Sequence, residues 1–147
     1  AQLEAESYKV LGTTGNDSLT GSAYKDALYG NAGNDTLNGV GGDDVLYGED
    51  GADALVGGIG NDTFSGGAGN DYLQGDSGSD TYLFGPGGGG DTIYDYFSGD
   101  TGVDTLEFTG GIDRADVDFL VEGNYTHVQV RATFDAVLIQ NGFISYG

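Results

Sequence analysis

The sequence predicts an all-β protein whose chain winds into a right-handed parallel β-roll (a parallel β-helix), and three features of residues 12–83 predict it. Cut into consecutive blocks of nine residues, this stretch has glycine at the first position of all eight blocks and aspartate at the sixth. The eighth position is apolar in every block. Three columns that stay in phase over eight blocks indicate a repeat protein in which each block is one structural unit.

The last three positions of a block are expected to form a strand. The blocks read GTTGNDSLT, GSAYKDALY, GNAGNDTLN, GVGGDDVLY, GEDGADALV, GGIGNDTFS, GGAGNDYLQ and GDSGSDTYL. Because successive side chains of a strand face opposite ways, a three-residue strand at positions seven to nine would point only its middle side chain inward. These inward residues are Leu19, Leu28, Leu37, Leu46, Leu55, Phe64, Leu73 and Tyr82. A narrow ladder of stacked apolar side chains is therefore the expected core.

The first six positions are expected to form a turn that binds calcium. Glycine at positions one and four allows a positive φ and a tight bend with the carbonyl groups turned to one side. The aspartate at position six adds a carboxylate, and Ca²⁺ binds about six to eight carboxylate and carbonyl oxygens with loose geometry. Ordinary polar turns, the alternative interpretation, would need neither a fixed period nor an aspartate in every sixth position.

Two blocks would complete one coil, so every second turn stacks on the same edge, about 4.8 Å from the next. The aspartates would then form two columns. The first column contains Asp17, Asp35, Asp53 and Asp71. The second contains Asp26, Asp44, Asp62 and Asp80.

On these blocks the chain resembles the RTX family, the haemolysin-type calcium-binding repeats of secreted bacterial toxins, proteases, lipases, alginate epimerases and adhesins. The resemblance implies an ion between stacked turns, shared by the aspartate of each and completed by carbonyls of the glycines and their neighbours. Three gaps in each column give about six ions or more. The further residues expected at these sites are Gly30, Ala32, Asn34, Gly39, Gly41, Asp43, Gly48, Asp50, Gly57, Ile59, Asn61, Gly66, Ala68 and Asn70.

The second block is the weakest of the eight as a calcium turn. Tyr24 stands where glycine is usual and is disfavoured at a positive φ, and Lys25 adds a competing cation. We therefore expect the gap between the Asp26 and Asp44 turns to bind calcium least well. The fifth block keeps its glycines and is expected to bind.

The flanks are expected to close the roll at both ends, since repeat proteins need caps. Residues 1–11 form an amino-terminal flank with a possible strand at 8–11. Residues 84–107 contain two degenerate repeats that place Asp91 and Asp104 at position six as further candidate ligands. Residues 108–147 are expected to form a β cap, with strands near 117–121, 125–131 and 136–139. Similar carboxy-terminal flanks in the RTX family start calcium-driven folding, which the resemblance implies here.

An aromatic cluster near the end of the roll has two interpretations. Its members are Tyr82, Phe84, Tyr94, Tyr96, Phe97 and Phe108. A buried cluster would plug the open end of the apolar ladder, which is the interpretation we favour, whereas an exposed one would indicate a binding surface.

Composition predicts that the chain does not fold without counterions. It has 147 residues, 30 glycines and a formal net charge of −20, from 24 acidic against 4 basic residues. Repulsion between stacked aspartates and the backbone entropy of glycine both oppose folding. The basic residues are Lys9, Lys25, Arg114 and Arg131, too few for a nucleic-acid or anionic-membrane surface. The sequence has no cysteine for disulfides, and no transmembrane run or signal peptide is apparent in it.

Catalysis is not expected. Residues 75–78, GDSG, match a serine-protease nucleophile sequence, but the repeat explains them and the one histidine, His127, lies in a predicted strand. Gly85, Gly87 and Gly90 fit a GxGxxG pattern without the strand and helix that a dinucleotide site needs. Zinc would require several histidines or cysteines at close spacing.

Two classes of function compete. The first is a monomeric, non-catalytic module of a secreted bacterial protein, which passes unfolded through a type I secretion apparatus and is folded outside by calcium. The resemblance implies the secretion, whereas the turns and the charge predict the calcium switch. The second is an adhesive or surface-binding module of an RTX adhesin. A third possibility is the non-catalytic part of an RTX enzyme such as a protease, lipase or epimerase.

Overall fold

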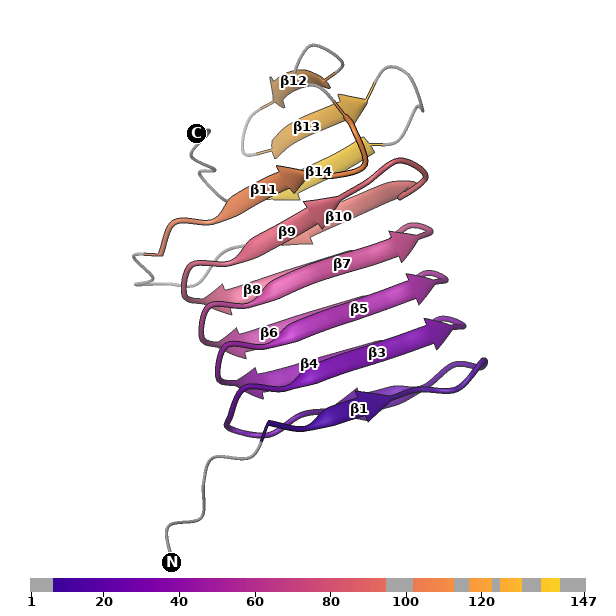
Figure 1. Cartoon of the computed structure of the whole chain (residues 1–147). Helices are drawn as coiled ribbons and strands as arrows, with labels where there is room; N and C mark the ends of the chain where they lie inside the picture. Colours follow the sequence, from indigo (N-terminus) through magenta and orange to yellow (C-terminus); the bar gives the residue numbers. More distant parts are fainter. Residues whose placement is uncertain (1–6, 95–101, 113–116, 123–124, 131–135, 141–147) are drawn as a thin grey trace, which may run out of the picture.

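The chain folds into a flattened coil of two facing sheets that rises from the amino-terminal end (Figure 1). The computed structural model describes residues 7–94, 102–112, 117–122, 125–130 and 136–140. Within this part every element is a strand, which confirms the all-β class. The chain passes from one sheet to the other at each turn, so that neighbouring strands of a sheet come from alternate repeats.

The first sheet has the order β1-β3-β5-β7-β9-β11 and the second has the order β12-β13-β14-β10-β8-β6-β4-β2. The strands of the first sheet are β1 (Lys9–Leu11), β3 (Ala27–Ala32), β5 (Val45–Asp50), β7 (Thr63–Ala68), β9 (Thr81–Phe84) and β11 (Thr105–Phe108). Those of the second are β2 (Ser18–Thr20), β4 (Thr36–Gly41), β6 (Ala54–Ile59), β8 (Tyr72–Ser77), β10 (Gly90–Tyr94), β12 (Val117–Glu122), β13 (Tyr125–Val130) and β14 (Ala136–Gln140).

The register confirms that two blocks make one coil. Strands β3 and β5 are parallel and pair Leu28 with Leu46, and β4 and β6 pair Leu37 with Leu55. Each partner lies 18 residues further along the chain, which is twice the nine-residue period. The chain is therefore a parallel β-solenoid, as the three phased columns predict.

The strands are longer than the sequence predicts. Strands β3 to β8 each have six residues and run from position seven to position three of the next block. The expected length of three residues is wrong because positions two and three also pair with the next coil. After Tyr29 pairs with Tyr47, the pairing passes over position one and resumes with Asn31 and Glu49.

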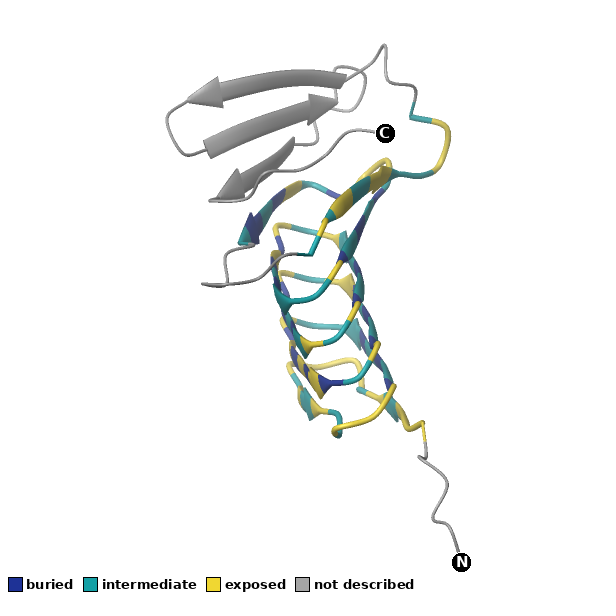
Figure 2. Cartoon of the chain, turned by 90° about the vertical axis from the view of Figure 1, so that its left-hand side faces the viewer, coloured by how far each residue is buried: buried dark blue, intermediate teal, exposed yellow. Residues whose placement is uncertain are grey.

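The apolar column at position eight forms the core, as expected. Leu28, Leu37, Leu46, Leu55 and Phe64 are fully buried, and Leu19 packs against them at the amino-terminal end. Figure 2 shows buried positions alternating with intermediate and exposed ones along the strands of the narrow coil. The rings of Phe64 and Tyr82 stack with their centroids 5.1 Å apart, which continues the ladder upward.

Part of the aromatic cluster closes this ladder. Tyr82 and Phe84 are buried, and the ring of Phe84 meets that of Phe108 edge to face at 6.0 Å. The inclusion of Tyr94 is wrong, because Ile93 takes the inward position of β10 and alternation places Tyr94 on the outer face. There it stacks on Tyr72 of β8 at 6.4 Å. Tyr96 and Phe97 lie outside the described residues.

The expected flanking strands are present. Strand β1 pairs with β3 at the amino-terminal end, and β14 pairs in parallel with β10 at the other. Strands β12 and β13 follow antiparallel to one another, so the second sheet continues past the coil, and His127 lies in β13. Arg114, Arg131 and residues 1–6 and 141–147 lie outside the described residues. In the part of the chain that the structure describes, there is no helix long and apolar enough to span a membrane.

Candidate calcium-binding turns

The position-six aspartates form two columns, one along each edge of the coil. The N–H of each aspartate donates to Oδ1 of the aspartate one coil further on. In one column the donor–acceptor distances are 2.8 Å from Asp17 to Asp35, 2.7 Å from Asp35 to Asp53, 2.9 Å from Asp53 to Asp71 and 3.1 Å from Asp71 to Asp91. In the other they are 2.7 Å from Asp26 to Asp44, 2.7 Å from Asp44 to Asp62, 2.8 Å from Asp62 to Asp80 and 2.9 Å from Asp80 to Asp104. Both degenerate repeats therefore continue the columns.

In the middle of the columns, the other carboxylate oxygen, Oδ2, is buried and has no hydrogen-bond partner. The buried Oδ2 atoms without a hydrogen-bond partner include those of Asp35, Asp44, Asp53, Asp62 and Asp71. A buried polar atom normally has a partner, and a buried carboxylate without one is costly. These bare oxygens fit a bound cation, which would supply the missing interaction.

Glycine at position one leaves room for these oxygens. A Cβ atom on Gly30 would overlap Asp35 Oδ2 and lie 2.7 Å from the carbonyl oxygen of Gly48 in the next coil. A Cβ atom on Gly39 would overlap Asp44 Oδ2 in the same way. The carboxylate oxygen and the carbonyl oxygen thus converge on a space that a side chain would fill. This cradle of oxygens fits a hard cation.

Position one does not bend the chain, although a positive φ was expected there. The positive φ values fall instead at positions two and four, for example 75° at Asn31 and 121° at Gly33. Position one stays in an ordinary conformation and needs glycine for space. The prediction that Tyr24 is strained by a positive φ is also wrong, because the first two turns bend differently and Tyr24 has no positive φ.

Burial changes the acidity of the columns. It raises the pKa of Asp44, Asp53 and Asp62 to about 6, against the hydrogen bond from the preceding aspartate's N–H, which lowers it. The charges of column neighbours add to the rise, and burial also raises the pKa of Asp71. Without a cation, the folded state therefore disfavours the ionised form of these groups.

Position-five side chains form a further hydrogen-bonded column along each edge, whereas the sequence predicted Asn34, Asp43, Asn61 and Asn70 only as calcium-site residues. The side-chain oxygens of Asn34, Asp43, Asn61 and Asn70 accept N–H groups of the next coil at 3.0, 2.9, 2.8 and 2.8 Å. Their donors are Ala52, Asn61, Ser79 and Gly90. These side chains thus hold coils together. The signal was available, since asparagine or aspartate recurs at position five.

The position-three carbonyls already join neighbouring coils. The N–H groups of Gly33, Gly42 and Gly51 donate to the carbonyls of Asp50, Ile59 and Ala68 at 2.9, 2.8 and 2.8 Å. A carbonyl oxygen has two lone pairs and can still bind a cation. The predicted site residues Ala32 and Gly41 also stand at position three of their blocks. The predicted site residues Gly48, Gly57 and Gly66 stand at position one of theirs. In the described residues, no three acidic or histidine side chains gather as a metal-binding group, so backbone oxygens are needed to complete any site.

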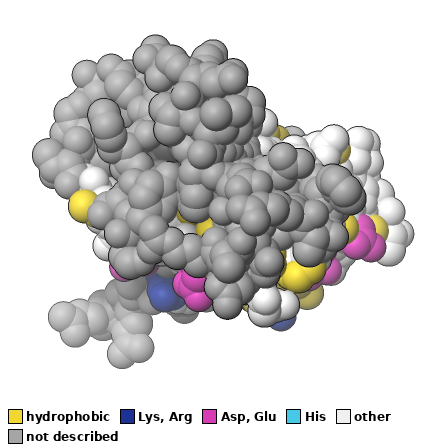
Figure 3. Space-filling view, turned by 90° about the horizontal axis from the view of Figure 1, so that it is seen from above, with side chains coloured by type: hydrophobic (Ala, Val, Ile, Leu, Met, Phe, Trp, Pro, Cys, Tyr) yellow, Lys and Arg dark blue, Asp and Glu magenta, His cyan; other side chains and the backbone are white. Residues whose placement is uncertain are grey.

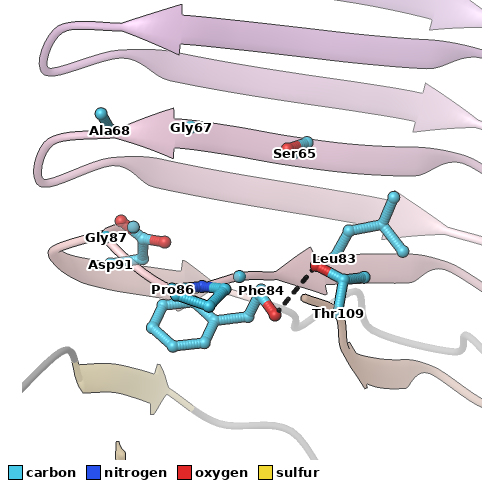
Figure 4. Close-up of a pocket in the computed structure, with 11 residues that line it drawn as sticks. Ser65, Gly67, Ala68, Leu83, Phe84, Pro86, Gly87, Asp91 and Thr109 are labelled. Atoms are coloured by element: carbon cyan, nitrogen blue, oxygen red, sulfur yellow. Dashed lines mark hydrogen bonds between the residues drawn. The ribbon is translucent and has the colours of Figure 1, made fainter. Parts of the chain in front are cut away.

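The last turn of the first column is enlarged. Phe84 replaces the position-one glycine, and two extra residues precede Asp91. A pocket of about 190 Å³ opens here, lined by Ser65, Gly67, Ala68, Leu83, Phe84, Gly85, Pro86, Gly87, Gly88, Asp91 and Thr109 (Figure 4). The carbonyl of Phe84 accepts the N–H of Thr109 at 2.8 Å and its hydroxyl at 3.4 Å. The regular geometry of the turns therefore ends at the Asp71 turn on this edge.

The described charged side chains outside the aspartate columns lie on the outer surface. Seen from above, acidic side chains appear at several places along the described rim, with basic side chains only singly between them (Figure 3). The ammonium of Lys9 lies 4.6 Å from the centre of the Tyr29 ring. The described face shows no basic patch of the kind that binds nucleic acid.

A parallel β-solenoid in which buried carboxylate oxygens without hydrogen bonds lie near backbone carbonyls is typical of a metal-binding repeat protein. The family profile of the RTX calcium-binding nonapeptide repeat matches four times, at residues 11–46, 29–64, 47–82 and 57–93. The chain belongs to the family of RTX calcium-binding repeat proteins.

Two solved structures are similar to the chain. The extracellular lipase LipA from Serratia marcescens is 16% identical with a TM-score of 0.46, and the match covers 95% of this chain and 39% of the lipase. The solution structure of the AlgE6R3 subunit from the Azotobacter vinelandii mannuronan C5-epimerase is 26% identical with a TM-score of 0.40, covering 95% of this chain and 78% of that one. The search of curated proteins returns no match.

Proposed function

We propose that this module folds when calcium binds its turns outside the cell, and that it thereby assists the type I secretion and folding of a larger bacterial protein. In the calcium-poor cytosol the acidic chain would stay unfolded and could be threaded through a secretion channel. Millimolar calcium outside would then drive folding. The module itself would be monomeric and non-catalytic, with any enzyme or toxin activity in another part of the parent protein.

The observation that carries this proposal is the row of bare, buried Oδ2 atoms, those of Asp35, Asp44, Asp53, Asp62 and Asp71. Each is costly to bury alone, and together they place repelling charges in two columns. A calcium ion between turns would remove both costs. The carboxylates would bind it together with carbonyls of positions one and three, which are the oxygens that calcium prefers.

The size of the effect is sufficient for a folding switch. A ligand that binds only the folded state stabilises it by RT ln(1 + [L]/Kd). For a Kd near 10⁻⁴ M and about 1 mM calcium, each ion contributes roughly 1.4 kcal/mol. Four to six ions would together contribute about 6 to 8 kcal/mol, comparable to the stability of a whole domain.

The test is a calcium titration followed by far-ultraviolet circular dichroism, with magnesium as the control. We expect a spectrum of an unfolded chain in chelator and a cooperative gain of strand with calcium. Magnesium should have little effect, because it requires a stricter octahedral geometry. A chain that is already rich in strand in chelator would overturn the calcium switch.

A surface-binding role is the second candidate, and the Tyr72–Tyr94 pair favours it. Tyr72 is 38% exposed on the outer face of β8, and its hydroxyl donates to Gln74 Oε1 at 3.1 Å. Tyr94 is half-buried beside it, and aromatic rings with one accessible side are common in contact surfaces. If the module is adhesive, replacing both tyrosines by alanine should reduce its retention on target cells without moving the calcium midpoint. Equal retention of both proteins would exclude this pair as the contact.

A further inference from the structure

The first two turns of the roll satisfy their aspartates differently from all later described turns. Asp17 Oδ2 accepts the N–H of Thr13 at 2.6 Å and its hydroxyl at 2.9 Å. Asp26 Oδ2 accepts the N–H of Ser22 at 2.5 Å and its hydroxyl at 2.8 Å. The oxygen that is bare in the middle of the columns therefore has two donors in each of these turns.

The same hydroxyls also fix the bend of the turn. Thr13 Oγ1 accepts the N–H of Gly15, and Ser22 Oγ accepts the N–H of Tyr24, both at 3.2 Å. Neither position two nor position four has a positive φ in these turns. Later turns, by contrast, have positive φ at both, as at Glu49 and at Gly51. The array thus contains two turn conformations, one closed on its aspartate and one open.

Asp26 shows that the closed turn needs no cation. Its side chain is 1% exposed, as deeply buried as that of Asp44 one coil above. Yet its Oδ1 accepts the N–H of Tyr8 at 2.8 Å, and its Oδ2 has the two donors of Ser22. These three hydrogen bonds give both oxygens of the carboxylate protein partners.

The residue at position two of a block separates the closed turns from the open ones. A hydroxyl residue occurs there only in the first two of the eight blocks, as Thr13 and Ser22. The later blocks have Asn31, Val40, Glu49, Gly58, Gly67 and Asp76. A side-chain hydroxyl at this position can reach the carboxylate four residues ahead, and the later side chains carry none.

We propose that the first coil is a metal-free cap in which Thr13 and Ser22 take the place of calcium, so that bound calcium begins one coil later. The first ions would lie between the Asp35 and Asp53 turns and between the Asp44 and Asp62 turns. This inference rests on the proposed calcium function and refines it. In these first turns the hydrogen-bond donors of Thr13 and Ser22 satisfy the carboxylate oxygen that calcium would bind in later turns.

The sharpest test is a crystal of the whole chain grown with terbium in place of calcium, because terbium's anomalous scattering locates each ion. We expect peaks in the Asp35–Asp53 and Asp44–Asp62 gaps and none in the Asp17–Asp35 and Asp26–Asp44 gaps. Peaks in the first two gaps would overturn the cap. A map without peaks in any gap would overturn calcium binding itself, so the two failures are distinct.

Two matched pairs of substitutions test the same point in solution. Asp35→Asn and Asp44→Asn should each reduce the bound calcium by about one ion per chain, because each removes a charged ligand. Asp17→Asn and Asp26→Asn, one coil earlier, should leave the number unchanged in equilibrium dialysis with elemental analysis. A loss of calcium in these two folded variants would overturn the proposal. If they fail to fold, the terbium positions in the unaltered chain decide.

Discussion

At the scale of single residues, the glycines of the turns have two different structural roles. From the third block on, those at position four take a positive φ, as Gly42 does at 104°, and bend the chain. Those at position one leave space for a carboxylate oxygen and a carbonyl of the next coil, as Gly39 does for Asp44 Oδ2. The two roles make different predictions for substitution, because a Cβ atom is harmful at position one through overlap and not through backbone strain.

Gly39→Ala tests the role of position one. The new methyl group would overlap Asp44 Oδ2 and displace it, so we expect a loss of about 1 to 3 kcal/mol in calcium and a higher calcium midpoint. Gly15→Ala is the matched control, since its Cβ would meet nothing closer than Thr13 Oγ1 at 3.9 Å. Circular dichroism along a calcium titration measures both. Equal midpoints for the two variants would refute the steric role.

Val40→Gly tests the backbone at position two. Val40 has φ of 83° and is 43% exposed, an unfavourable conformation for a β-branched residue that buries little surface. Glycine should relieve this strain and stabilise the folded protein by about 1 kcal/mol in urea unfolding with calcium. Val56→Gly, in a regular part of β6, should instead destabilise it by roughly 0.5 to 1 kcal/mol. If both variants lose stability alike, Val40 is not strained.

At the scale of elements, the coils are held together by columns of side chains as well as by the sheets. The position-six columns carry buried carboxylates, whereas the position-five side chains join coils through hydrogen bonds to backbone N–H groups. Asn34 accepts the N–H of Ala52 at 3.0 Å, but Ala52 has no side-chain oxygen to continue the column. The column is therefore interrupted below Asn70.

Ala52→Asn should repair this interruption. An asparagine at 52 would reach the N–H of Asn70 as Asn34 reaches that of Ala52, since both pairs lie 18 residues apart. One added hydrogen bond at this exposed turn should raise the free energy of unfolding by about 0.5 to 1 kcal/mol. Ala52→Leu, which has no acceptor, is the control for side-chain size. Urea unfolding in saturating calcium compares the three proteins, and equal gains in both variants would exclude the hydrogen bond.

At the scale of the whole molecule, stability depends on the balance between columns of buried charge and whatever neutralises them. If calcium binds as proposed, protons and calcium would compete for the same oxygens, since metal binding needs the ionised carboxylate. Each coil of the described part contributes two buried apolar side chains from position eight, one from each sheet, as Leu46 and Leu55 illustrate. With so small a core, the proposed calcium ions would supply a large share of the folding free energy.

The calcium-free roll should therefore gain stability as the pH falls from about 6 to 4. The pKa of Asp44, Asp53 and Asp62 is about 6 in the calcium-free folded state against 3.8 for the free side chain. A raised pKa means that the folded state binds more protons than the unfolded state between about pH 4 and 6, so acid stabilises the calcium-free roll in this window. Protonation at the same time removes the ligand from calcium.

Circular dichroism in chelator checks this effect, because strand content should increase as the pH is lowered from 6 to 4. Asp44→Asn, which cannot ionise at that position, should show a smaller increase. A strand content in chelator that does not change with pH would show that burial does not raise the pKa of these carboxylates.

The nine-residue period was enough to predict the coil, the two aspartate columns and the apolar ladder, because a strict repeat places equivalent residues in equivalent environments. It even located Asp91 and Asp104, whose N–H-accepting Oδ1 atoms continue the columns. The six-residue strands and the outward position of Tyr94 were not predicted. Strand length depends on pairing between coils, which is a contact between residues 18 apart and leaves little trace within one block.

By itself, then, the sequence determined the class of fold, the calcium-binding family and the edges on which the carboxylates stack, since these follow from periodicity and residue chemistry alone. Only the tertiary structure decided which carboxylate oxygens are bare and which, at Asp17 and Asp26, are already bonded. It also showed that position one needs glycine for space. Both depend on how one coil lies upon the next, because the partner of an oxygen is set by distance in space and not by its place in the repeat.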